Sequence, residues 1–137
     1  MVTGGLYKFF SDCPQFLKKR ININFLGHNE GDVSIEPIGD FSIIKKYSDG
    51  KRVMSQEFCL SIRCAFDANI RLNLKDAQLM EAVCQWIDEQ DRAGALPNLS
   101  DTLAALGISV TKTPHIYESS VQGAKMQIYF KLTYREI

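Results

Sequence analysis

Several features that mark particular classes of protein are missing from this 137-residue sequence. No apolar run approaches the length of a membrane-spanning helix, and the opening Met-Val-Thr-Gly-Gly has neither the basic nor the apolar region of a secretory signal. Neither positive nor negative charge is in excess, because sixteen basic and sixteen acidic side chains give a formal net charge of zero. We therefore expect a cytoplasmic protein with no membrane partner that does not bind nucleic acid through bulk charge.

Residues suited to catalysis and metal binding are also few. Only two histidines are present, His28 and His115. The four cysteines form no Cys-x-x-Cys pair and have no histidine at metal-ligand spacing, so most are expected to be free and buried. They are Cys13, Cys59, Cys64 and Cys84. Pairing of Cys13 or Cys59 with His115 stays open, because nucleophile and base meet in space rather than in sequence.

Cofactor motifs are absent as well. The terminal Gly-Gly is neither a Walker motif nor a dinucleotide fingerprint, since no strand precedes it. The acidic segment 30–40 lacks the alternating oxygen ligands of an EF-hand, because Val33 and Ile35 interrupt it. The sequence predicts no catalytic residue, no cofactor and no metal site.

Two amphipathic helices are predicted. The first is short and ends at Pro14. Its apolar residues recur at helical spacing: Leu6, Phe9, Phe10 and Cys13. The second runs from about Ile70 to Ala93, because Gly94 suits the left-handed position that ends many helices and Pro97 prevents the helix from resuming. Its inward stripe is formed by Leu79, Val83, Trp86, Ile87 and Gln90.

Asp49-Gly50 is the strongest turn signal in the chain. It separates two alternating segments, 41–47 and 53–66, and this dipeptide is favoured where both turn residues need a positive φ. A two-residue loop would place Phe41 opposite Phe58, Ile43 opposite Gln56 and Lys45 opposite Met54. Phe41 and Ile43 would then share the inward face of the hairpin.

The other segments give weaker signals. Residues 21–25 alternate like a brief strand, and residues 27–40 are predicted to be irregular around a short extended piece at 33–36. Residues 97–107 are predicted to hold a loop and a short helix over 102–106, before a strand that starts at 108–110 and continues to 118. Residues 124–135 alternate as the last strand.

Two antiparallel hairpins separated by a helix predict an α+β fold in a single domain, residues 1–137. One antiparallel sheet of about four strands packs one face on one long helix and one or two short helices. The other face of the first hairpin has small, lightly charged residues, unlike a fully hydrated sheet. They are Val53, Ser55, Glu57, Cys59, Ser61, Arg63 and Ala65. Either the first helix or another subunit covers this face, and both alternatives stay open.

The ordered set of short motifs in this chain resembles a family of small virion proteins from tailed phages (siphophages) of Gram-positive hosts. These are labelled minor capsid proteins and are similar in role to tail terminators. The resemblance rests on the short helix ending in Cys13-Pro14 and on residues 23–27 (INFLG), 31–37 (GDVSIEP), 46–50 (KYSDG) and 86–97 (WIDEQDRAGALP). It covers most of the chain and is weakest over residues 100–121.

This resemblance implies a non-enzymatic, structural head–tail joining protein, assembled in the bacterial cytoplasm and located at the neck of the virion. Such proteins form a ring, typically of six subunits, that caps the tail tube and presents a surface to the head connector. DNA passes through the ring without sequence-specific binding. A ring requires a head-to-tail interface between copies that closes on itself.

We expect two groups of residues to form that interface. The hairpin tip contributes Lys46, Tyr47, Asp49, Lys51 and Arg52, and the outer face contributes Ser55, Cys59, Ser61 and Ala65. The outward side chains Lys125, Lys131 and Arg135 of the last strand are candidates to line the channel.

Three other functions remain open at this stage. A head-completion or connector adaptor would bind the portal side of the neck rather than the tail tube. From a different class, a small cytoplasmic enzyme would use a cysteine and a histidine. A binding module that stays monomeric would form no ring.

Overall fold

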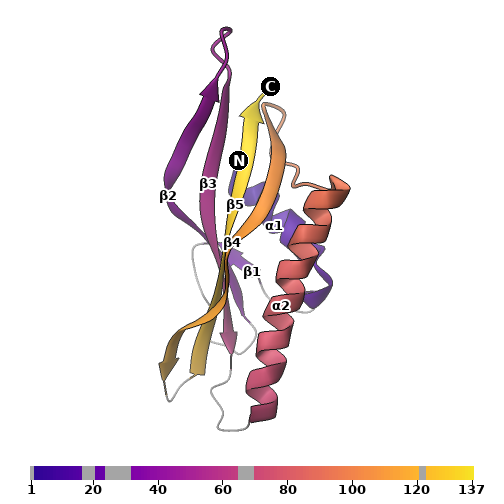
Figure 1. Cartoon of the computed structure of the whole chain (residues 1–137), viewed down its shortest axis with the longest axis vertical. Helices are drawn as coiled ribbons and strands as arrows, with labels where there is room; N and C mark the ends of the chain where they lie inside the picture. The colour runs from indigo at the N-terminus through magenta and orange to yellow at the C-terminus, as the bar shows by residue number, and fades with distance from the viewer. Residues whose placement is uncertain (1, 17–20, 24–31, 65–69, 121–122) are drawn as a thin grey trace.

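The computed structural model describes residues 2–16, 21–23, 32–64, 70–120 and 123–137 (Figure 1). At residues 3, 64, 70–76, 113–120 and 123–124 it describes the backbone alone. The elements in chain order are α1 (Val2–Ser11), the 3₁₀ turn η1 (Pro14–Phe16), β1 (Ile21–Ile23), β2 (Val33–Lys46), β3 (Arg52–Cys64), α2 (Ile70–Ala93), β4 (Leu103–Ser120) and β5 (Gly123–Glu136).

The fold is α+β, with a mixed five-stranded sheet in the order β1-β2-β3-β5-β4. The two predicted hairpins, β2–β3 and β4–β5, lie side by side because β3 pairs with β5. The prediction of four antiparallel strands is wrong in one respect. The short strand β1 adds to the edge of β2 in parallel, from Ile21 opposite Val33 to Ile23 opposite Ile35.

Both helices pack on the same face of the sheet. The ring of Phe10 in α1 lies 5.3 Å from that of Phe130 in β5, and Phe9 lies 4.8 Å from Trp86 of α2. The core beneath them is fully buried, and each such side chain contributes about 1.5–3 kcal/mol to folding. Its centre is formed by Phe10, Leu60, Met80, Val83, Ile87, Ile128 and Phe130. Since α1 lies with α2, it does not cover the outer face, which is the face opposite the helices.

The prediction for α2 is confirmed at both ends of its range. Gly94 has a φ of 72° and its amide donates to the carbonyl oxygen of Asp91, as expected of a left-handed helix stop. The Asp91 carboxylate reaches across to β4, where Oδ1 accepts a hydrogen bond from the Ile108 amide at 3.0 Å. That amide lies on an edge strand, so Asp91 satisfies a donor that would otherwise face outward from the sheet.

The predicted register of the first hairpin is wrong. The loop has three residues, 48–50, closed by a hydrogen bond from the Gly50 amide to the Tyr47 carbonyl. Gly50 takes the positive φ of 90° alone, which is typical of a turn followed by a bulge. The longer loop makes Lys45 pair with Val53 instead of Met54, and a further register shift between Ile43 and Lys45 makes Ile43 pair with Met54 instead of Gln56.

Strand β2 is also longer than predicted. It is continuous from Val33 to Lys46. The segment predicted to be irregular forms a bulge within the strand near Gly39, which has a φ of 66°. This bulge makes Pro37, not Phe41, the partner of Phe58. Phe41 and Ile43 are exposed by 44% and 52%, so they do not join the core as predicted.

The predicted helix over residues 102–106 is instead the start of β4. Ser100 Oγ accepts hydrogen bonds from the Thr102 and Leu103 amides, a contact that can begin either a helix or a turn. Pairing with β5 decides the outcome, since Leu103 lies opposite Glu136 and Ala105 opposite Tyr134. The alternation predicted for β5 is confirmed, because Met126, Ile128, Phe130, Leu132 and Tyr134 are all buried.

The close approach of α1 to the loop after α2 gives a test of this packing. A Cβ atom at Gly5 would lie 2.6 Å from the Asn98 carbonyl oxygen, whereas one at Gly4 would meet nothing within 4 Å. We expect Gly5→Ala to lower the free energy of unfolding by about 1–3 kcal/mol through overpacking. Gly4→Ala, the matched control, is expected to raise it by up to about 1 kcal/mol through helix propensity. Urea denaturation measures both, and equal effects would contradict this packing.

Candidate interaction surfaces

The first hairpin extends beyond the helices and leaves apolar side chains in solvent. We call residues 37–51 the arm, and every one of them is exposed. Figure 1 shows the β2–β3 hairpin projecting past the end of α2. Its large apolar residues are Ile38, Phe41, Ile43, Ile44 and Tyr47, exposed by 38–58%. A group of this size on one protruding element is typical of a protein interface.

Lysines lie between these apolar residues. Lys45, Lys46 and Lys51 are exposed, and the Lys45 ammonium lies 4.9 Å from the centre of the Tyr47 ring. Asp49, predicted as an interface residue, also stabilises the turn, since its Oδ1 accepts a hydrogen bond from the Lys51 amide at 3.0 Å. The tip therefore presents three cations and a tyrosine on a fixed turn.

Arg52 differs from the lysines because it is paired within the chain. Its Nε donates to Glu136 Oε1 at 2.8 Å, and its backbone amide donates to the same oxygen at 2.9 Å. This pair joins the start of β3, next to the tip of the arm, to the end of β5. The hydrogen bond from Arg52 lowers the pKa of the Glu136 carboxyl, and the same contact raises the pKa of Arg52. Arg52 thus anchors the arm.

The small residues of the outer face are less accessible than the sequence suggested. Cys59 and Ser61 are only 5% and 4% exposed, while Ser55 is half-buried. Gln127 on β5 covers part of this region, and its Nε2 donates to Ser61 Oγ at 3.2 Å. Ala65 lies outside the described residues.

A polar hollow of about 370 Å³ opens above these residues. It is lined by Glu36, Cys59, Ser61, Lys125, Gln127 and Tyr129. The Gln127 Oε1 atom is buried there and has no hydrogen-bond partner within the part of the chain that the structure describes. An unsatisfied acceptor of this kind favours a donor from outside the described chain, such as a water or another subunit.

The three candidate channel residues form a column rather than a cluster. Lys125, Lys131 and Arg135 all project from the outer face of β5, and the last two are exposed. A rise of about 3.4 Å per residue places Lys125 and Arg135 roughly 34 Å apart along the strand. Lys131 lies opposite Glu57 of β3, which offsets its charge.

The three cysteine side chains that the structure describes are poorly suited to nucleophilic chemistry. Burial raises the pKa of Cys13 and of Cys84 to about 11, and it also raises the pKa of Cys59. A nucleophilic cysteine needs the opposite shift, toward the thiolate. His115 lies on β4 opposite Gln127, two strands away from Cys59 on β3, which is a separation of about 10 Å. His28 lies outside the described residues.

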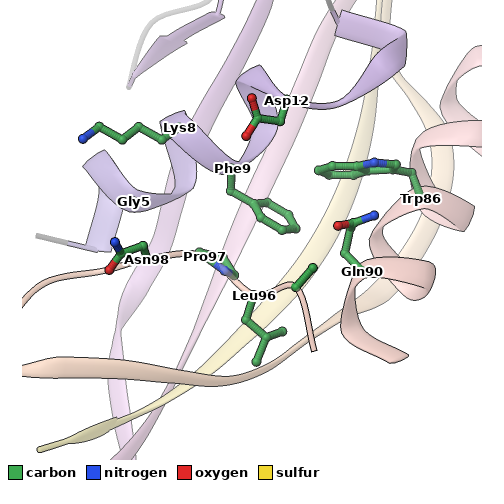
Figure 2. A pocket seen from close by; sticks show the side chains of 10 residues that line it. Gly5, Lys8, Phe9, Asp12, Trp86, Gln90, Leu96, Pro97 and Asn98 are labelled. Carbon is green, nitrogen blue, oxygen red and sulfur yellow. The ribbon is translucent and has the colours of Figure 1, made fainter. Parts of the chain in front are cut away.

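A groove that the sequence did not predict lies between α1 and the end of α2. It has a volume of about 290 Å³. Figure 2 shows Phe9, Trp86 and Leu96 around it, with Asp12 and Gln90 at its edges. The groove needs two segments that are distant in sequence, residues 5–12 and 86–98, so only the apolar character of Trp86 and Leu96-Pro97 hinted at it.

Other kinds of site are not evident. No three histidine, cysteine or acidic side chains gather into a metal site among the residues whose positions are described. No helix in the described ranges is long and apolar enough to cross a membrane. No family model matches this sequence, and no curated protein matches it either. The surfaces that bear on function are therefore the arm, the outer face and the groove.

The Arg52–Glu136 pair gives a pH-dependent prediction. The pKa of Glu136 is lower in the folded state than in the unfolded chain. Its contribution to stability is therefore fully present at a pH above its pKa in the unfolded chain, and it is lost as the pH falls through its pKa in the folded state. We expect Glu136→Gln to lower the melting temperature at pH 7, and the difference from the wild type to vanish in acid. Glu89→Gln, at an exposed position of α2, is the control and should have no such profile. A pH-independent difference for Glu136→Gln would contradict the role of the pair.

Proposed function

We propose that this protein is a structural component of a phage virion, a tail terminator that forms a ring at the head–tail junction. In that role it caps the tail-tube protein and presents a surface to the head connector, without catalysing a reaction. The observation that carries this proposal is the arm, whose apolar side chains project beyond the helices and need a protein partner. The resemblance in sequence motifs supplies the identity of the partners.

The distribution of surfaces supports a ring. A head-to-tail ring needs two different contact surfaces on different sides of each subunit. The arm extends from β2, whereas α2 packs near β4, at the other end of the strand order. Figure 1 places β2 and α2 on opposite sides of the molecule. Each copy can thus contact one neighbour on each side.

The charge distribution suits passage of DNA without tight binding. The formal net charge is zero, and the column of Lys125, Lys131 and Arg135 on β5 is spread along the strand. Spaced cations beside acidic residues give weak, sequence-independent attraction to phosphates, which is sensitive to salt. We propose this column as the surface that faces the DNA.

The direct test is deletion of the gene in the phage that encodes it. We expect filled heads without attached tails, and tail tubes whose length is no longer regulated, because polymerisation has no stop. Supplying the wild-type gene in trans should restore infectious particles.

Two variants sharpen this test. Complementation should fail with Phe41→Ser combined with Ile44→Ser, which removes apolar side chains from the arm, and should succeed with Glu89→Gln. Normal particle yields from the deletion phage, or a gene that lies outside any phage or prophage genome, would contradict the proposal.

A further inference from the structure

We propose that the arm of one copy docks in the groove between α1 and α2 of the next copy. This inference deepens the proposed function, because it names the two surfaces that would meet in the ring. It rests on the exposed side chains of the arm, the composition of the groove and the positions of both in the fold.

The groove has the size and chemistry of a site for side chains. Its volume of about 290 Å³ is at the lower limit for small-molecule pockets, which favours one or two inserted side chains over a whole ligand. Phe9, Trp86 and Leu96 provide apolar walls (Figure 2). Trp86 and Leu96 are only half-buried in the single chain, so a partner would complete their burial.

The arm offers complementary side chains. Phe41, Ile44 and Tyr47 are exposed by 44%, 58% and 46%, and they lie within one short segment. Aromatic side chains that fill a pocket are the usual anchors of a protein interface.

Charge favours the same match. Three lysines of the arm flank the apolar residues: Lys45, Lys46 and Lys51. The groove has the Asp12 carboxylate at its edge. Lys8 also lines the groove, but Figure 2 shows its side chain directed away from Phe9 and Trp86. Opposite charges around an apolar centre would set the orientation of the docked arm.

The occupant must come from a second copy. In the sheet, β3, β5 and β4 follow β2 in order, so the arm and the helix α2 beside β4 are separated by three strand spacings, about 14 Å. The arm also runs along the strand direction, and the Arg52–Glu136 pair fixes β3 beside the tip of the arm to the end of β5. It cannot fold back into the groove of its own chain. Contact between two different surfaces on two copies is head-to-tail, as ring formation requires.

A mixing experiment tests this inference. The arm variant carries Phe41→Ser and Ile44→Ser, while the groove variant carries Asp12→Lys and Gln90→Lys, which places cations opposite the arm lysines. Glu81→Lys, an exposed change on α2 outside the groove, is the charge control. Sedimentation at increasing concentration measures assembly. Trp86 is the only tryptophan of the chain, so its emission reports occupation of the groove.

We expect the wild type and the Glu81→Lys control to self-associate, with a shift of Trp86 emission to shorter wavelength as water leaves the groove. Each of the two variants alone should associate at least about tenfold more weakly. An equimolar mixture should form dimers and nothing larger, because the intact groove of one variant accepts the intact arm of the other. Dimer formation also proves that both variants are folded.

Three results would overturn the inference. One is self-association of either variant at the wild-type strength. Another is a mixture that forms no dimer. The third is a wild type whose sedimentation and Trp86 emission do not change with concentration. The gene deletion can still give the terminator phenotype in each of these cases, and the ring would then use other surfaces.

Discussion

The length of the helical layer relative to the sheet is the constraint on which the rest of the structure depends. Helices cover only one face, and α2, the longer helix with 24 residues, spans about 36 Å, whereas β2 with fourteen residues spans about 46 Å. The core around Phe10 and Phe130 is therefore complete at the middle of the sheet, and the first hairpin continues beyond it. The exposed arm is a consequence of this difference in length, and the outer face is uncovered because both helices pack on the opposite face.

Features set by local chemistry or by one clear periodicity could be predicted from the sequence. The range of α2 followed from Gly94 and from apolar spacing, and β5 followed from strict alternation. The register of the first hairpin could not be predicted, because one additional loop residue before Gly50 changes every pair. The segment 102–106 reads as a helix locally, but pairing with β5 outweighs helix propensity.

The candidate surfaces also include features that the local sequence predicts and features that depend on distant residues. The exposed lysines of the arm could be predicted from the sequence, because they lie beside a predicted turn. Ser61 is buried in contact with Gln127, which is 66 residues away along the chain. The groove needs α1, α2 and the following loop together, so no local pattern predicts it. The sequence does not distinguish Arg52 from the neighbouring lysines, because its partner Glu136 is 84 residues away along the chain.

Native-state hydrogen exchange of the backbone amides tests the central claim most directly, because it reports which strands the core stabilises. In dilute protein, amides of β3 and β5 beside Phe58 and Phe130 should exchange slowly, and those of residues 38–46 in the arm should exchange much faster. The arm amides should become protected when copies assemble. Arm amides as protected as the core in dilute protein would show that the helical layer supports the whole hairpin, and would contradict this account.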